Sequence, residues 1–394
     1  MANQESLLKL DINMRFSFRI LFSLFTLISF SLSAQKYSNE FLNIPVGARA
    51  QSMGGAQIGS VGDATSGFWN PAGLTKLPLD LQVAAMHNEW FASIGRYDFV
   101  GIAGPIEKES KYLGFTFIRF GVDNIPNTLS LYEKDGSINY SNVTTFNAAD
   151  YAFMLHYAQS FKKIGLSVGA TTKVVHRNVG TFANSWGFGL DLGAQYTYKD
   201  FSFGLMLKDI STTFNAWSFS FTDEEKETLS LTGNEIPIQS LEITRPTIGF
   251  GFSYKKQFNI GSSKEGKKQK YIGLMTNLDL NMTTDGNRNT LISTPAVSFD
   301  PVFGAELHYF DLIFIRGGIN NIQQFRDINQ NNTWAVQPNF GVGFRIYQFY
   351  IDYALGLNAG GALIDNIEGA ILSHLVSVKI DINFEFIKKA MKDE

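Results

Sequence analysis

Residues 185–198 alternate between apolar and polar side chains without a break. One face begins with Trp186 and ends with Tyr196 and Tyr198, and the other carries only Gly, Ser, Asp, Gln and Thr. A period of two is typical of a β-strand, and strands in soluble proteins usually run about 5–6 residues. Trp186 and Tyr196 lie about 33 Å apart along a strand. A tilt of about 40° reduces this to about 25 Å, the height of the lipid-facing band of an outer-membrane barrel. The segment therefore predicts a membrane-spanning strand.

The end of the chain shows the same pattern. Five apolar residues alternate with polar ones: Val376, Val378, Ile380, Ile382 and Phe384. The intervening positions include Lys379 and Asp381. Charges on one face and β-branched residues on the other need two solvents, lipid outside and a polar lumen inside. The edge strand of a soluble sandwich is the alternative explanation.

Twelve further segments alternate less cleanly: residues 81–90, 94–104, 111–120, 148–161, 164–177, 201–210, 246–256, 270–281, 301–309, 311–319, 338–346 and 348–357. Together they predict an all-β fold, a 14-stranded antiparallel transmembrane β-barrel. Tight links alternate with the long polar links 121–147, 211–245, 282–299, 320–337 and 358–370. Short turns on one side and long loops on the other are typical of outer-membrane barrels. The short link 91–93 and the long basic link 257–269 do not fit this alternation.

The start of the chain predicts export. Arg15 and Arg19 precede an apolar run from Ile20 to Phe30, and small residues follow up to Ala34. This order is that of a signal peptide, which we place at residues 1–34, with Met14 as an alternative start. The run is shorter than the ~20 residues that a spanning helix needs. Since Cys is absent, a lipoprotein anchor is excluded. We expect the mature protein in the outer membrane of a Gram-negative bacterium.

Nothing in the sequence indicates catalysis. The five His residues are scattered, with no pair at metal-ligand spacing. No nucleophile lies in a recognisable arrangement with a base. The formal net charge of −3 gives no reason to expect nucleic acid. We therefore expect no catalytic residue, metal or cofactor, and a protein that is not an enzyme.

Residues 41–75 do not alternate and are rich in small residues and glycines. A proline after Asn70 favours an Asx-type turn there. A compact hatch inside the barrel is one interpretation, and a first strand with a linker is the other. Arg49 and Asp63 are candidate buried partners for each other or for lumen charges such as Asp352 or Lys379. The candidate hatch residues are Arg49, Gly54, Gly55, Asp63, Trp69, Asn70 and Pro71.

Three strings in this segment resemble the PorV/PorQ family, which lies within the FadL-like superfamily of outer-membrane barrels. They are Gly47-Ala48-Arg49-Ala50 with Met53-Gly54-Gly55-Ala56, then Gly62-Asp63-Ala64, then Trp69-Asn70-Pro71-Ala72-Gly73-Leu74. The resemblance implies a fourteen-stranded barrel with an N-terminal hatch, and a place in the type IX secretion system. The Asn-Pro-Ala element is shared with FadL-type fatty-acid channels. Gly54-Gly55 and Gly73 depart from the PorV pattern, which indicates a paralogue.

The link 211–245 contains an aromatic cluster where an outer loop should be polar: Phe214, Trp217, Phe219 and Phe221. Exposed aromatics at this density often mark a protein contact. The alternation of residues 216–221 is equally consistent with a strand that continues above the membrane. We take these four residues as a candidate partner-binding loop.

The expected organisation is a signal peptide at 1–34, a hatch at 35–80, a barrel at 81–386 and a periplasmic tail at 387–394. The expected function is that of a non-enzymatic barrel of the type IX secretion and sorting system. Its expected partners are a large translocon barrel, the attachment complex and secreted cargo. The alternative is a FadL-like channel for the uptake of small hydrophobic compounds.

Overall fold

The structure is a computed structural model. It describes residues 38–384 apart from 78–79, 92, 134, 232, 234, 237–238, 261–268, 287, 327–329, 331 and 359–370. The chain divides into two units, residues 1–36 and 37–394, and all described residues belong to the second. The expected signal peptide 1–34, the alternative start at Met14 and the tail 387–394 lie outside the described residues.

Seventeen strands form one antiparallel sheet. They are β1 (Leu81–Trp90), β2 (Gly95–Glu107), β3 (Lys111–Asn127), β4 (Thr144–Phe161), β5 (Leu166–Val179), β6 (Ala183–Tyr198), β7 (Phe201–Lys208), β8 (Thr213–Phe219), β9 (Gln239–Thr244), β10 (Thr247–Ile260), β11 (Lys270–Thr283), β12 (Ile292–Ser293), β13 (Ser298–Tyr309), β14 (Ile313–Arg326), β15 (Asn332–Ile346), β16 (Phe349–Asn358) and β17 (Ile371–Ile382). The helices are η1 (Glu40–Asn43), α2 (Ala48–Ser52), α3 (Ser66–Trp69), η2 (Pro71–Lys76), η3 (Tyr140–Asn142), η4 (Lys162–Ile164) and α4 (Asp223–Leu231).

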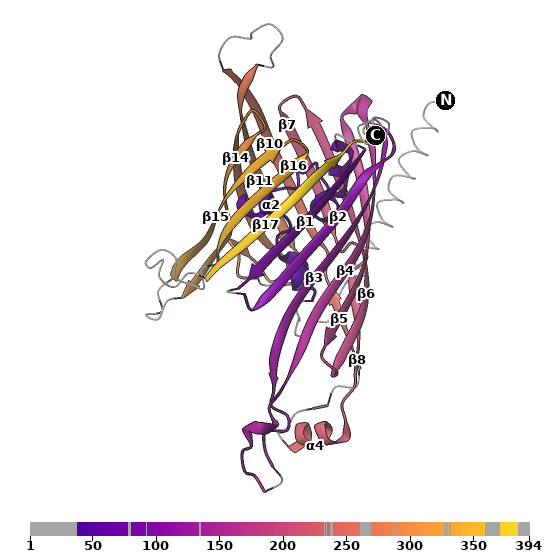
Figure 1. Cartoon of the computed structure of the whole chain (residues 1–394), viewed down its shortest axis with the longest axis vertical. Coiled ribbons are helices and arrows are strands. Elements are labelled where there is room, and N and C mark those ends of the chain that lie inside the picture. Colours follow the sequence, from indigo (N-terminus) through magenta and orange to yellow (C-terminus); the bar gives the residue numbers. More distant parts are fainter. Residues whose placement is uncertain are drawn as a thin grey trace, which may run out of the picture. The chain divides into compact units, whose positions relative to one another are not determined.

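The sheet closes on itself because β1 pairs with β17. Two barrel strands are each built from two pieces, β7 with β8 and β9 with β10, and β12 is a two-residue strand beside β13. The wall therefore has fourteen strands, and the predicted 14-stranded antiparallel barrel is confirmed (Figure 1).

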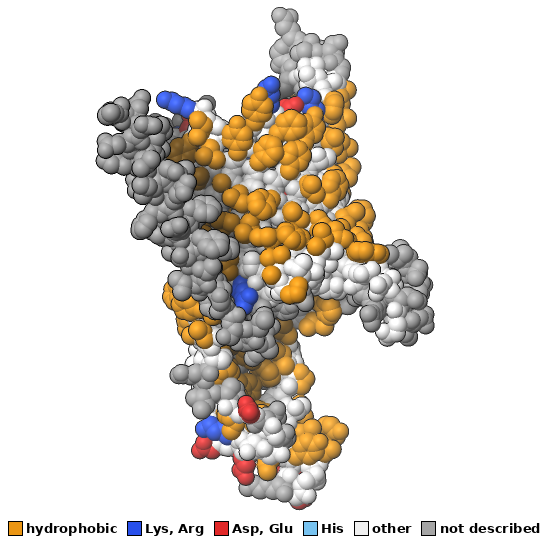
Figure 2. Space-filling view, turned by 180° about the vertical axis from the view of Figure 1, so that it is seen from behind, with side chains coloured by type: hydrophobic (Ala, Val, Ile, Leu, Met, Phe, Trp, Pro, Cys, Tyr) orange, Lys and Arg blue, Asp and Glu red, His pale blue; other side chains and the backbone are white. Residues whose placement is uncertain are grey.

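Alternation along the strands separates an outer and an inner face. On β6, Trp186 and Phe188 are about half exposed, whereas Ser185 and Gln195 are buried. On β17, Val376 is exposed and the side chains of Lys379 and Asp381 are buried inside. Hydrophobic side chains gather over the outer wall (Figure 2). These faces are the ones that the alternating sequence predicts.

The segment before β1 lies inside the barrel (Figure 1). It consists of η1, α2, α3 and η2 joined by turns, and it contributes much of the buried core, including Val46, Met53 and Leu74. Of the two interpretations of this segment, the compact hatch is the one observed. No helix among the described residues is long and apolar enough to cross a membrane.

Several links expected as loops are partly strand. β3 continues to Asn127 and β4 begins at Thr144, so both strands extend into the expected link 121–147. The expected link 211–245 contains β8, α4 and β9. Of the two interpretations of the aromatic cluster, the strand that continues is the one observed: Phe214, Trp217 and Phe219 belong to β8, which pairs with β6 and β9, and Phe221 follows it. Partner binding by these residues stays a prediction. Strand pairing satisfies backbone groups that a polar loop would leave to water, so the strand extends beyond the expected boundary.

Candidate functional site: the hatch and the extracellular mouth

The hatch packs against a set of glycines on the inner wall, which we call the glycine seat. A Cβ on Gly304 would lie 2.5 Å from Met53 O, and one on Gly169 would lie 2.6 Å from Ala72 N. A Cβ on Gly318 would overlap the Met53 backbone. The inner wall repeats this close approach on nine strands, at Gly101, Gly169, Gly193, Gly204, Gly251, Gly304, Gly318, Gly341 and Gly356. Since these positions carry no side chain, the hatch backbone packs directly on the strands.

The hatch has its own two glycines at tight turns. Gly54 and Gly55 follow α2 with φ of 66° and 90°, a left-handed conformation that side chains rarely adopt. A Cβ on Gly54 would meet the backbone of Ile319 at 3.0 Å, and one on Gly55 would meet the Trp69 ring at 3.3 Å. Glycine is therefore favoured at both positions for two reasons, the positive φ and the lack of space for a side chain.

Asn70 and Pro71 form the turn that the sequence predicts. The Asn70 side chain accepts a hydrogen bond from Ala72 N, and Pro71 is the first residue of η2. The amide of Asn70 also donates to Ile58 O at 2.9 Å and to Ala194 O of β6 at 3.1 Å. One buried residue thus shapes the hatch and ties it to the wall.

A carboxylate of the barrel holds another turn of the hatch. Asp279 Oδ2 on β11 accepts the backbone N–H groups of Gln57 and Ile58 at 2.7 and 2.8 Å. Gln195 on β6 donates to the carbonyl oxygens of Ile58 and Val61. Because buried backbone groups need partners, these bonds fix the position of the turn.

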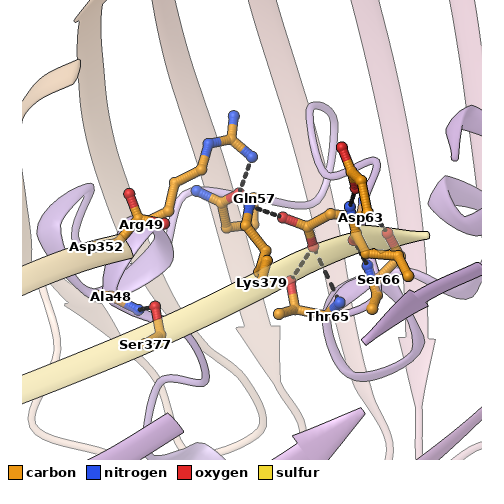
Figure 3. A network of polar contacts seen from close by, with 12 residues as sticks. Ala48, Arg49, Gln57, Asp63, Thr65, Ser66, Asp352, Ser377 and Lys379 are labelled. Atoms are coloured by element: carbon orange, nitrogen blue, oxygen red, sulfur yellow. Dashed lines mark hydrogen bonds and ion pairs between the residues drawn. The ribbon is translucent and has the colours of Figure 1, made fainter. Parts of the chain in front are cut away.

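Charged pairs fasten the other side of the hatch (Figure 3). Arg49 contacts Glu306 of β13 at 3.0 Å, and Lys379 of β17 donates to Asp63 at 2.7 Å. Lys379 is thus a partner that the sequence proposed for Asp63, whereas the partner of Arg49 is Glu306. Burial alone would raise the pKa of Asp63, but the positive charges of Lys379 and Arg49 outweigh it and hold that pKa well below its usual range.

A small cavity lies beside these pairs. Its volume of about 10 Å³ has room for about one water molecule, and residues including Arg49, Asp63, Phe99 and Lys379 line it. Within the hatch, Trp69 donates from its indole N–H to Val46 O at 2.9 Å.

An ionic cluster that the sequence analysis did not single out lies at the break between β7 and β8. Lys173 of β5 contacts Asp191 of β6 at 2.8 Å and Asp209 at 2.6 Å. Asp209 and Thr212 have positive φ, so the strand turns aside between its two pieces. Alternation places Lys173 and Asp191 on the inner face, but only the pairing register shows that they meet.

The extracellular mouth carries a row of aromatic rings. Trp217 and Phe219 share the inner face of β8 with Thr213 and Asn215, both fully buried, whereas Phe214 points outward and is 43% exposed. Trp217 stacks on Phe219, and Phe219 stacks on Phe221. Phe182 and Phe146 continue the row at centroid distances of 6.0 and 5.1 Å. We call Phe146, Phe182, Trp217, Phe219 and Phe221 the aromatic row; Phe146 and Phe182 were missed because they lie in other links.

Polar groups border the aromatic row. Arg177 lies over the Trp217 ring at 5.1 Å and pairs with Asp150 at 2.8 Å. The first described residues, Ser38 and Asn39, accept hydrogen bonds from Asn215 at 2.8 Å. The hatch thus begins at the extracellular mouth and runs down to β1 at the periplasmic end.

No three His, Asp or Glu side chains come together as a metal site within the described part of the chain. His156, one of the five scattered histidines, is buried between the hydroxyl groups of Thr171 and Thr116.

Comparisons with known proteins agree with this architecture. No protein family and no curated protein matches the sequence. Among solved structures, the chain is similar to the toluene transporter TodX of Pseudomonas putida, with 12% identity and a TM-score of 0.52, over 89% of this chain and 100% of that chain. The monoaromatic hydrocarbon channel CymD overlaps less well, with 12% identity and a TM-score of 0.49 over 88% and 99% of the two chains.

The fold and its closed wall define an outer-membrane β-barrel protein. More narrowly, the fold is that of the FadL-type barrels. Nothing in the comparisons points to the PorV/PorQ family within that group.

Proposed function

We propose that this protein takes up small hydrophobic compounds across the outer membrane and does so without catalysis. The observation that carries the proposal is the aromatic row, whose five rings are all partly buried and partly accessible at the extracellular mouth. Aromatic rings offer about 150–250 Å² each to an apolar ligand. The similar solved structure TodX is a toluene transporter, which supports this class of compound.

Ligand binding to the purified protein in nanodiscs tests the proposal. Toluene is titrated while tryptophan fluorescence is recorded, and saturable binding is expected. Removing one ring with Phe219→Ala should weaken binding by about 1 kcal/mol, or roughly fivefold, the scale of one aromatic contact. Trp186→Phe on the outer face is the matched control and should leave the affinity unchanged. Absence of saturable binding in the unaltered protein contradicts the proposal.

The second candidate is the role that the hatch resemblance implies, a partner-binding barrel of type IX secretion. Two observations favour it: the hatch packs closely against glycines of the inner wall, and aromatic rings at the mouth could serve a protein as well as a small ligand. Its expected partners are the large translocon barrel, the attachment complex and secreted cargo.

Pull-down in mild detergent with mass spectrometry separates the two candidates. An adaptor retains a much larger barrel, and Trp217→Ala, the anchor proposed for the partner, releases it without loss of folding. Truncation of a central anchor commonly costs about 2 kcal/mol or more. Retention of the same proteins by the variant would remove this support for the adaptor role.

A further inference from the structure

The strand that crosses the wall as β7 and β8 exchanges its inner and outer faces at the break between the two pieces. On β7 the even-numbered residues face the lumen, where Met206 is buried and Gly204 lies against the hatch. On β8 the odd-numbered residues do, since Asn215 is buried and donates to the hatch, whereas Phe214 is exposed outside. An ordinary strand keeps the same parity inside along its whole length. The break therefore inverts the strand.

The pairing register gives the size of the shift. If the register of β7 with β6 continued, Phe214 would lie opposite Ser185. The observed partner of Ser185 is Trp217, which is three residues further along the chain. A shift by an odd number of residues moves every side chain of a strand to the other face. In an unbroken strand the rings of Trp217 and Phe219 would thus point outward, away from the lumen.

The neighbouring strand is inverted at the same level. Thr244 of β9 and Gly249 of β10 both face the lumen, since Asn39 of the hatch donates to Thr244 and a Cβ on Gly249 would meet Ile58. These two inner positions are five residues apart, an odd number. Pro246, which has no N–H to donate to a ladder, lies between the two pieces. Because β8 pairs with β9 and β7 with β10, the two strands invert together and keep their pairing.

Two carboxylates hold the backbone at the break. The N–H of Asp209 lies beyond the last residue of β7 that pairs with β6, and it donates to Asp191 Oδ1 at 2.7 Å. Asp209 and Thr212 both have φ of 55°, which is unfavourable for a β-branched residue such as Thr212. The hydroxyl of Thr213 donates to the Asp209 carboxylate where β8 begins. Side-chain carboxylates thus take the place of the strand partner.

Lys173 keeps the two carboxylates together. Its ammonium contacts Asp191 at 2.8 Å and Asp209 at 2.6 Å, and its side chain is buried. Gly189 of β6 leaves room for the lysine to reach across, because a Cβ there would lie 2.6 Å from Lys173 Cε and would overlap the Thr213 hydroxyl. If Lys173 were removed, two buried carboxylates would lose the ammonium that contacts both. Continuous pairing would then compete with the break, because it offers ladder partners to the backbone between β7 and β8.

We propose that Lys173, Asp191 and Asp209 position the aromatic row in the lumen by stabilising the inverted register of β8. The three residues act through the strand and are positioning residues, since none of them belongs to the row. The rings of Trp217 and Phe219 face the lumen only in the inverted register, so loss of the cluster should weaken ligand binding. The ligand part of this inference rests on the proposed function, whereas the register part does not.

A disulfide that requires the inverted register tests the proposal, because the chain has no Cys of its own. Asn184 of β6 and Ser218 of β8 are partners on the outer face. Directly opposite residues have Cα atoms about 4.5–5.5 Å apart, within the range that a disulfide spans. In the continuous register Asn184 would face Asn215 instead. The Asn184→Cys/Ser218→Cys protein in nanodiscs should therefore form the disulfide on brief oxidation, as measured by mass spectrometry after alkylation of the remaining thiols.

Lys173→Met in this background should lower the disulfide fraction. Without the added cysteines it should weaken toluene binding roughly fivefold or more, the scale of one lost aromatic contact. Lys173→Arg keeps the charge and should restore both. Lys256→Met, which removes an ion pair with Asp200 at the periplasmic end, is the control and should change neither.

Gly189→Ala keeps every charge but displaces Lys173, and it should have the same two effects if Lys173→Met does not fold. Heat-modifiable gel mobility shows which variants fold. An unchanged disulfide fraction in the folded variants overturns the positioning role, whether or not toluene binds. A lower disulfide fraction with unchanged toluene affinity overturns the link between register and ligand. If the disulfide fraction falls as expected but even the unaltered protein binds no toluene, the register is supported and only the proposed function fails.

Discussion

Lys379, on the strand that closes the barrel, donates a 2.7 Å hydrogen bond to Asp63 of the hatch. Both side chains are nearly buried, at 11% and 12% exposure. A buried carboxylate that loses its cation is strongly unfavourable, so this pair couples the hatch to the seam of the wall.

Replacing Lys379 by Met should loosen the hatch and leave the barrel folded. Loss of one partner of a buried pair costs about 3–5 kcal/mol, and we expect the lower end because Arg49 and Thr65 still face Asp63. Limited proteolysis of the hatch reports the change, and heat-modifiable mobility reports the barrel. Lys226→Met, which breaks an exposed pair with Asp223, is the control. Equal protection of the hatch in Lys379→Met and Lys226→Met would show that other contacts are sufficient to hold the hatch in place.

The same pair makes hatch protection depend on acid. The folded pKa of Asp63 lies below its unfolded value of ~3.9, so its stabilisation is fully present above that value and is lost as the pH falls toward the folded pKa. Protection against pepsin should therefore hold above about pH 4 and decline below it. In Lys379→Met the pKa of Asp63 is less depressed, so protection should be weaker above pH 4 and should decline less below it. Identical pH profiles of hatch protection in the unaltered protein and in Lys379→Met would show that the acid dependence does not come from Asp63.

A methyl group in the glycine seat should disturb the hatch. In Gly318→Ala the new Cβ overlaps the Met53 backbone, whereas in Gly317→Ala, one residue earlier and facing outward, the nearest atom is 4.0 Å away. Overpacking of this kind typically costs about 1–3 kcal/mol. Hydrogen exchange of residues 50–60 should accelerate in Gly318→Ala only. Equal exchange rates in Gly318→Ala and Gly317→Ala would mean that the hatch can shift to accommodate the methyl group without a loss of stability.

A charge in the lipid band should weaken the wall. Leu190→Arg on the outer face of β6 should cost about 2–4 kcal/mol, and Asn184→Arg, on the same face near the extracellular end, about 0–1 kcal/mol. Urea titration followed by gel mobility measures both. Gln195→Arg on the inner face is not a mild control, since Gln195 is buried and donates to the hatch. Similar costs at 184 and 190 would refute the assigned depth.

Lys76 at the periplasmic side of the hatch should react unusually fast with acylating reagents. Desolvation by the surrounding protein, with the like charges of Arg49 and Lys255, lowers its pKa to about 8. More of its amine is therefore unprotonated at pH 8 than for a lysine of ordinary pKa, ~10.4. Mass spectrometry of the modified protein should give a midpoint near pH 8 at Lys76. A midpoint near pH 10 would contradict the shift.

Alternation alone predicted the fourteen strands and the inner and outer faces of β6 and β17. In a barrel with lipid outside and a polar lumen, every second side chain of a strand is apolar and faces the lipid. In the segment that does not alternate, the sequence indicated Arg49 and Asp63 as buried candidates and Asn70 as a turn residue. Neither the contact of Arg49 with Glu306 nor that of Lys173 with Asp209 could be predicted, because these depend on pairing register and on the strand break. Of the aromatic row, the sequence indicated Trp217, Phe219 and Phe221. Phe146 and Phe182 lie in other links and reach the row only through the fold.

The seat of glycines constrains how the protein is assembled. The strand that closes the barrel against β1 also contacts the hatch: Lys379 donates to Asp63, and the Ser377 hydroxyl oxygen accepts from the backbone N–H of Ala48. The glycines of the inner wall leave no room for a side chain between hatch and strands, so a hatch that entered an already closed barrel would have to pass these close contacts. Closure of the seam and seating of the hatch are therefore physically coupled.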